Sequence, residues 1–225
     1  MEKLRIIVLF EADFNTNNNW LGPAVMINTE TSELLADEQY SSRQHKVAVL
    51  QCLNKGLFYD LIRQWRRPAA LCSNNAKSGY DHITLLVAAL SLCRLGAPIS
   101  TAQSMMKTLH GMNHHIRMMY SDSQQSVGRK TWNALIAGIG QGNGTGPSIW
   151  AAVSSPMFDI MCQDRFYALL KGAVSHKQTK IVGFAFVDNT NLCITHNSDD
   201  AAQVARHMQE SVTHWEGCYK QQEEH

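Results

Sequence analysis

Three short polar segments stand at the ends of stretches that favour β-strands, and together they could form one chemical site. Asn75 ends the stretch AALCSNN, Gln141 and Gly142 precede an apolar run, and Asp188 with Asn189 separates two apolar arms. Carboxylate and amide oxygens are oxygen ligands of the kind that hard divalent cations accept. Taken singly, each segment has a simpler interpretation as a turn or loop, because Asn, Asp and Gly are common turn residues.

Two other groups of residues are weaker candidates for chemistry. The segment HGMNHH places His110 and His114 at i, i+4 spacing, but zinc needs a third ligand and the sequence contains no HExxH pattern. The segment RQWRRP could touch a phosphate backbone or form a solvated helix end. Its arginines are Arg63, Arg66 and Arg67.

Hydrophobic periodicity indicates which elements would position these residues. Residues 4–10 are apolar and β-branched, which predicts a strand, and the segment NTNNNW that follows is typical of a turn or loop. Apolar side chains recur every three or four positions over 47–65 and predict an amphipathic helix. The stretch AALCSN, 69–74, predicts a short buried strand.

The remainder of the chain alternates between predicted helices and hairpins. Helices are expected over 83–95, from Ser100 to about His110, and from Ile149 to Met161. Residues 115–121 are predicted to pair with 131–139, and KIVGFAFV with NLCIT around Asp188. Asp199 and Asp200 begin a last amphipathic helix. Mixed helices and hairpins predict an α+β fold, in which an antiparallel sheet is backed by helices on one face.

Composition limits the class of protein without identifying its activity. The chain has 225 residues, 44% of them apolar and 17% charged, and a formal net charge of +1. This predicts a globular chain without a membrane span, and gives no global electrostatic sign of nucleic-acid binding. The six cysteines include no CxxC pair. Free thiols in a reducing compartment explain them better than disulfides do, so we expect an intracellular location, cytoplasmic or nuclear.

The order of the polar segments resembles the three central palm motifs of reverse transcriptases, which are RNA-directed DNA polymerases. The closest resemblance is to sequences of the retroelement (non-LTR-like) type. NAKSGYD matches the first motif, GQGNGTGPSIW the second and FVDNTN the third. Two upstream segments, KLRIIVL and ADEQYSSRQHK, resemble finger segments of the family. They place Arg5, Gln39 and Arg43 at matching positions.

The resemblance implies an activity, a cofactor and partners. The implied reaction is template-directed DNA synthesis from deoxynucleoside triphosphates on a primer–template, assisted by two Mg²⁺ ions. Asp188, Asn75 and Asn189 occupy the catalytic carboxylate positions, and Asp188 is the expected metal ligand. The implied nucleotide-binding residues are Arg5, Ala76, Tyr80, Gln141 and Gly142, with Tyr80 packing on the sugar.

The sequence departs from the family at two of these positions. Asn75 and Asn189 stand where the family has aspartates, so only Asp188 remains of three expected carboxylates. An amide keeps an oxygen lone pair but loses the negative charge that holds a dication. We therefore expect weakened Mg²⁺ binding and a chain that is inactive or nearly inactive.

The resemblance also predicts the organisation of the chain. Residues 1–68 correspond to partial fingers and residues 69–225 to the palm, with no thumb. The alternative is a non-catalytic remnant that acts only as a nucleic-acid-binding or protein-interaction module.

Overall fold

The computed structural model describes residues 8–76, 79–117, 119–128, 138–172 and 174–221. It combines helices with small antiparallel sheets, which confirms the predicted α+β fold class. Among the described helices, none is long and apolar enough to cross a membrane. The predicted division at residue 68 stays a prediction.

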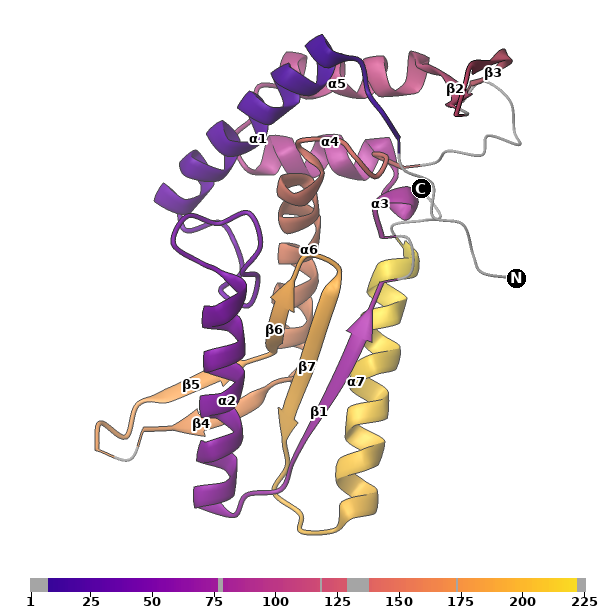
Figure 1. Cartoon of the computed structure of the whole chain (residues 1–225). Helices are drawn as coiled ribbons and strands as arrows, with labels where there is room; N and C mark the ends of the chain where they lie inside the picture. The colour runs from indigo at the N-terminus through magenta and orange to yellow at the C-terminus, as the bar shows by residue number, and fades with distance from the viewer. Residues whose placement is uncertain (1–7, 77–78, 118, 129–137, 173, 222–225) are drawn as a thin grey trace.

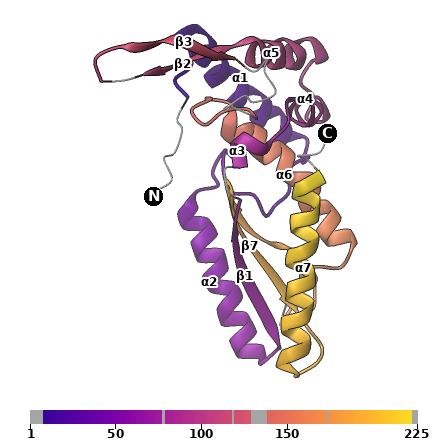
Figure 2. The same cartoon turned by 90° about the vertical axis from the view of Figure 1, so that its right-hand side faces the viewer.

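A three-stranded antiparallel sheet forms the centre of the lower part of the molecule (Figure 1). Its order is β1 (Ala69–Asn75), β7 (Asn189–Thr195), β6 (Gly183–Phe186). Because side chains alternate along each strand, the sheet has two apolar faces to cover. Helix α2 (Ala48–Trp65) packs on one face through Phe58 against Phe184. The other face packs on α6 (Gly146–Gln163) and α7 (Ala201–Gln221), and Figure 2 shows α2 and α7 flanking the strands.

The helices around this sheet begin and end close to the positions that the sequence predicted. Helix α2 ends at Arg66, whose left-handed φ of 50° closes the last turn, as C-terminal caps commonly do. Helix α7 begins after Asp200, whose carboxylate accepts a hydrogen bond from the Ala202 amide. Helix α6 is buried around most of its circumference, which agrees with its nearly unbroken apolar sequence.

A helical layer lies above the sheet and packs on the first half of α6 (Figure 1). It contains α1 (Ala12–Thr31), α3 (Gly79–His82), α4 (Leu85–Arg94) and α5 (Ile99–Gly111). Helices α4 and α5 confirm the helices predicted over 83–95 and from Ser100. Apolar side chains from α1, α4, α5 and α6 form one core here, including Met26, Leu92, Leu109 and Ile149.

The prediction of a loop at NTNNNW was wrong, because these residues belong to α1. Tertiary hydrogen bonds override the weak helix propensity of asparagine at this place. The buried Asn18 amide donates to Asn143 Oδ1 at 2.8 Å, and the Asn18 carbonyl accepts from Thr145 Oγ1 at 2.9 Å. Asn15 accepts from the Gly144 amide at 2.9 Å. The asparagines therefore attach α1 to the glycine-rich loop before α6.

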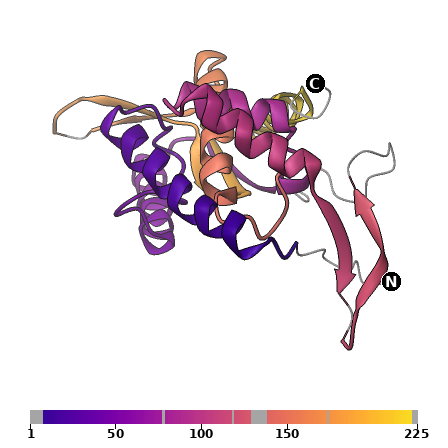
Figure 3. The same ribbon diagram turned by 90° about the horizontal axis from the view of Figure 1, so that it is seen from above.

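Two further hairpins project on opposite sides of the molecule (Figure 3). Strand β2 (Asn113–Arg117) pairs with β3 (Asp122–Gly128), so residues 115–121 do not form the single strand that was predicted. Residues 131–137 of the predicted partner lie outside the described residues, so the pairing with 131–139 stays a prediction. The other hairpin, β4 (Ala168–Lys171) with β5 (Gln178–Ile181), was not predicted. KIVGFAFV is thus divided between β5 and β6.

Candidate functional site

The strand register brings three of the predicted catalytic positions to one end of the sheet. Asn75 lies directly opposite Asn189 in the β1–β7 ladder, so both side chains belong to the same face. The Ala76 amide, one residue on, donates to the Asp188 carbonyl at 3.0 Å. Asn75 and Asn189 are exposed and Asp188 is half-buried. Residues more than 110 positions apart in sequence therefore meet at the tip of the β6–β7 hairpin.

The hairpin tip has a constrained backbone. Val187 has a φ of 54°, in the left-handed region that β-branched residues rarely adopt. Such a conformation persists where surrounding contacts hold it in place. Here the carbonyl of Val187 accepts a hydrogen bond from Gln39 Nε2 at 3.4 Å, and the same nitrogen donates to Ser154 Oγ of α6 at 3.2 Å.

Gln39 is the central residue of this support. Its side chain is fully buried, and its Oε1 accepts from the Ser41 amide at 3.1 Å. The chain around it adds two backbone bonds along one edge of β6, from Tyr40 N to Ala185 O and from Ala185 N to Glu38 O. The sequence placed Gln39 by resemblance alone. In the structure, its side chain bonds both the Val187 carbonyl at the hairpin tip and Ser154 of α6.

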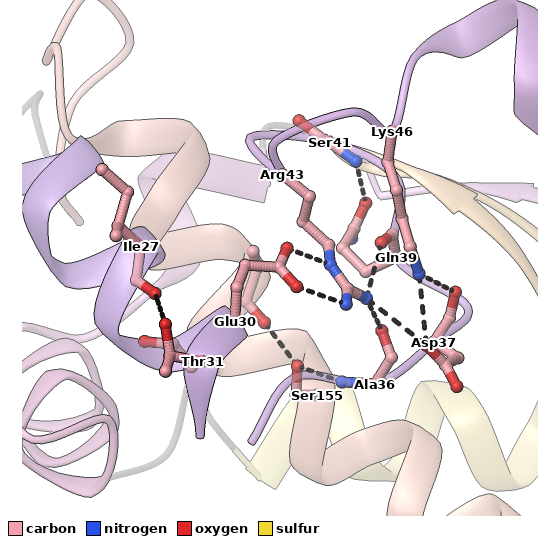
Figure 4. Close-up of polar contacts among 12 residues, drawn as sticks. Ile27, Glu30, Thr31, Ala36, Asp37, Gln39, Ser41, Arg43, Lys46 and Ser155 are labelled. Atoms are coloured by element: carbon pink, nitrogen blue, oxygen red, sulfur yellow. Dashed lines mark hydrogen bonds and ion pairs between the residues drawn. The ribbon is translucent and has the colours of Figure 1, made fainter. Parts of the chain in front are cut away.

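Arg43, the other matching residue of the segment ADEQYSSRQHK, bonds to neighbouring residues of the protein (Figure 4). Its guanidinium makes a two-bond contact with Glu30, at 2.5 and 2.8 Å. It also donates to the carbonyls of Ala36 and Gln39. With 7% of the side chain exposed, Arg43 is a structural clamp between α1 and the segment that carries Gln39. Four of its five N–H donors are occupied within the protein, so it is poorly placed to bind a phosphate.

Tyr80 lies beside the hairpin and is coupled to it electrostatically. Burial, and secondarily the charge of Asp188, raise the pKa of the Tyr80 phenol to about 12. The Tyr80 ring packs edge-on against Trp150, with ring centroids 6.1 Å apart. The backbone carbonyl of Tyr80 accepts a hydrogen bond from the Ile139 amide at 2.9 Å. A Cβ at Gly146 would touch the ring at 3.4 Å. The predicted contact of Tyr80 with a sugar stays a prediction.

Gln141 and Gly142 lie in the glycine-rich loop between Ile139 and Gly146, so both ends of that loop contact Tyr80. Gly142 is exposed with a φ of 113°, a conformation that favours glycine, and Gln141 is half-buried. Among the described hydrogen bonds, none joins Gln141 or Gly142 to the hairpin tip. The structure thus brings the loop to Tyr80, and a shared nucleotide pocket remains a prediction.

Arg5 lies outside the described residues, so its predicted role is not tested. The described chain begins three residues later at Val8, whose amide donates to the Gln141 carbonyl at 2.8 Å. The segment that follows Arg5 therefore reaches the glycine-rich loop.

The oxygen atoms at the hairpin do not fit a two-magnesium centre. Asp188 supplies one carboxylate, and in the described ranges no group of three or more His, Cys, Asp or Glu residues could hold a metal ion. Asn189 Oδ1 instead accepts a hydrogen bond from Asn191 Nδ2 at 3.3 Å. Magnesium bound by few protein ligands depends on carboxylate charge, which two neutral amides do not provide.

Comparisons with known proteins give a limited result. No protein-family model matches the chain, and no curated protein matches it. Among solved structures, the chain is similar to telomerase from Candida albicans, in a complex with a fragment of telomeric RNA. The TM-score is 0.44 with 12% identity, over 86% of this chain and 32% of that chain. The chain thus spans about a third of its neighbour's length, and a likeness at this level carries no inference about activity.

Proposed function

We propose that this chain is a reverse-transcriptase-like palm that keeps the strand geometry of a nucleotidyl-transfer site without its charge. One observation carries the proposal: Asn75 faces Asn189 across the ladder, while the adjacent Ala76 amide is bonded to the Asp188 carbonyl. Positions 75, 188 and 189 hold aspartates in the family that the sequence resembles. The chain is proposed to be inactive or nearly inactive in DNA synthesis.

The physical reason is the loss of two negative charges with little change in shape. Asparagine and aspartate have nearly the same volume, so the ladder and the hairpin accept either residue. Two-metal catalysis needs a clamp that stabilises both the attacking and the leaving oxygen. One carboxylate with two amides leaves that clamp without most of its charge.

The remaining assignments belong to the same proposal. Ala76, Tyr80, Gln141, Gly142 and Arg5 would surround a deoxynucleoside triphosphate, and a primer–template would lie across the exposed strand ends. The contacts of the glycine-rich loop with Tyr80 support a common location for the first four. An intracellular setting, cytoplasmic or nuclear, is proposed with them.

A single-nucleotide primer-extension assay with Mg²⁺ tests the proposal. The wild-type chain is expected to incorporate no more nucleotide than Asp188→Asn. Restoring both carboxylates, as Asn75→Asp with Asn189→Asp, should raise incorporation at least about tenfold, because it returns the charge on which metal binding depends. That gain should disappear when Asp188→Asn is added.

The matched control places the same two charges elsewhere, as Asn74→Asp with Asn113→Asp. Asn74 is the neighbour of Asn75 on β1, and its side chain belongs to the other face of the sheet. Robust, Mg²⁺-dependent incorporation by the wild-type chain would overturn the proposal. An equal gain from the control variant would do so as well.

A further inference from the structure

A basic groove lies at the opposite end of the β1–β7 pair from the candidate site. Its main cavity, of about 510 Å³, is bounded by the end of α2, the β4–β5 hairpin and the residues after β7. An adjoining cavity of about 350 Å³ shares Arg67, His196 and Asn197 with it. We call these two adjoining cavities together the basic groove.

The charge of the groove has one sign. Arg66, Arg67 and Lys171 line the main cavity, and Arg165 lines the adjoining one. None of the described residues that line either cavity is acidic. Within the described part of the chain, none of these four cations is ion-paired with a carboxylate. The whole chain carries a net charge of only +1, so this concentration of charge is local.

Hydrogen bonds hold the walls of the groove together. The His196 amide donates to the Pro68 carbonyl at 2.9 Å, which extends the β1–β7 ladder by one bond. Arg67 donates to the Leu169 carbonyl of β4 at 3.3 Å and to Asn197 Oδ1 at 3.1 Å. A guanidinium has five N–H donors, so Arg67 is fixed in the wall while three donors remain for a ligand.

The helix terminus alone does not explain this cluster. Cations at the C-terminal end of a helix interact favourably with its dipole, which accounts for Arg66 and Arg67 directly after α2. Lys171 belongs to β4 of the β4–β5 hairpin, and Arg165 precedes that strand. Gathering like charges without carboxylate partners is unfavourable by itself, and a cleft lined by one sign of charge attracts anionic ligands.

We propose that the basic groove binds the phosphates of a nucleic-acid strand. Its two adjoining open cavities give room for more than one phosphate, and Arg67 offers the planar fork that phosphate oxygens accept. Trp65 and Tyr167 lie in its walls, and aromatic rings can stack with bases. The seven residues of β1 separate the groove from Asn75 by roughly 20 Å, at about 3.3 Å per residue. The inference does not depend on the polymerase ancestry proposed above.

Fluorescence anisotropy with a labelled single-stranded RNA oligonucleotide tests the groove, using two variants of equal charge. Arg66→Gln with Lys171→Gln removes two exposed cations whose side chains make no hydrogen bond within the described part of the chain. Lys107→Gln with Lys220→Gln removes two exposed cations outside the groove. The groove variant should bind about tenfold more weakly, and the slope of log affinity against log salt should fall by about 1.4, at about 0.7 per phosphate contact. The control should stay within about twofold of wild type.

Three results would overturn the inference. One is a wild-type chain that does not bind the oligonucleotide at low salt. Another is an equal loss of affinity in both variants, which would indicate non-specific attraction. The third is groove-dependent binding of inorganic tripolyphosphate without binding of the oligonucleotide, which would assign the groove to a small polyanion. Thermal unfolding of each variant should match wild type, so that a loss of binding is not a loss of fold.

Discussion

The two ends of the β1–β7 pair differ in their side chains and in their charge. At one end, two amides and a single carboxylate meet at a hairpin tip that buried hydrogen bonds hold in place. At the other end, four cations from three segments, three of them exposed, surround an open groove. The first end brings three polar side chains together with a single negative charge, and the second has several positive charges without carboxylate partners in the described residues. The backbone arrangement at the hairpin tip is therefore maintained without carboxylates at 75 and 189.

The difference follows from what holds each end together. Strand register, the buried Gln39 and the Arg43 clamp determine the position of Asp188, and none of these contacts depends on a charge at 75 or 189. A fold of this kind tolerates Asn at those positions. Removing the surface charges of the groove would remove its attraction for anions, although the β1–β7 ladder would remain.

The largest expected effect compares an arginine from each end. Arg43→Gln should lower the free energy of unfolding by about 3 kcal/mol, because it breaks a mostly buried pair with Glu30 and two bonds to carbonyls. Arg66→Gln should change it by less than about 0.5 kcal/mol, as expected for an exposed side chain. Urea unfolding measures both. Similar losses for the two variants would remove the distinction between the ends.

A smaller effect is expected at Gln39. Gln39→Leu leaves the Val187 carbonyl and the Ser41 amide without their side-chain partner, and should cost about 2 kcal/mol of unfolding free energy. Gln44→Leu, an exposed change in the same segment, serves as control and should cost less than about 0.5 kcal/mol. The Gln39 variant should bind oligonucleotide at the groove as wild type does. Weaker binding would mean that the two ends are coupled.

The smallest expected effect is a change in the pKa of Tyr80 when the charge of Asp188 is removed. The pKa of its phenol is about 12 against an ordinary 10.0, so this group's contribution to stability is complete below pH 10 and is lost between pH 10 and 12. Asp188→Asn should lower the pKa slightly, because burial is the larger cause. A phenolate absorbance titration, taken as the difference from Tyr80→Phe, measures the shift. A return to the ordinary value would make Asp188 the main cause.

Most of the sheet and its helices could be predicted from local patterns. The β6–β7 hairpin, α2, α6 and α7 each have a strong periodicity or a clear turn. The meeting of Asn75 with Asn189 was expected only in general terms, since strand ends can converge. Which residues face each other depends on the register of a non-local ladder, which no local pattern specifies.

The failures have tertiary causes. The asparagines of α1 form a helix because Asn15 and Asn18 bond the glycine-rich loop, far away in sequence. KIVGFAFV is divided because its first residues pair with β4 whereas residues 183–186 pair with β7, a choice of partner that no local pattern specifies. Only part of the basic groove could be predicted from the sequence. RQWRRP supplies Arg66 and Arg67, whereas folding brings Lys171 and Arg165 to the same place.

Manganese binding, followed by electron paramagnetic resonance without nucleic acid, tests the central claim most directly. Mn²⁺ accepts the same oxygen ligands as Mg²⁺. We expect the wild-type chain to bind it no better than Asp188→Asn does. The variant with aspartate at both 75 and 189 should bind at least about tenfold more tightly, and should lose that gain with Asp188→Asn. Binding by the double variant that equals wild type would contradict the claim that this fold keeps the geometry of a metal site and lacks only its charge.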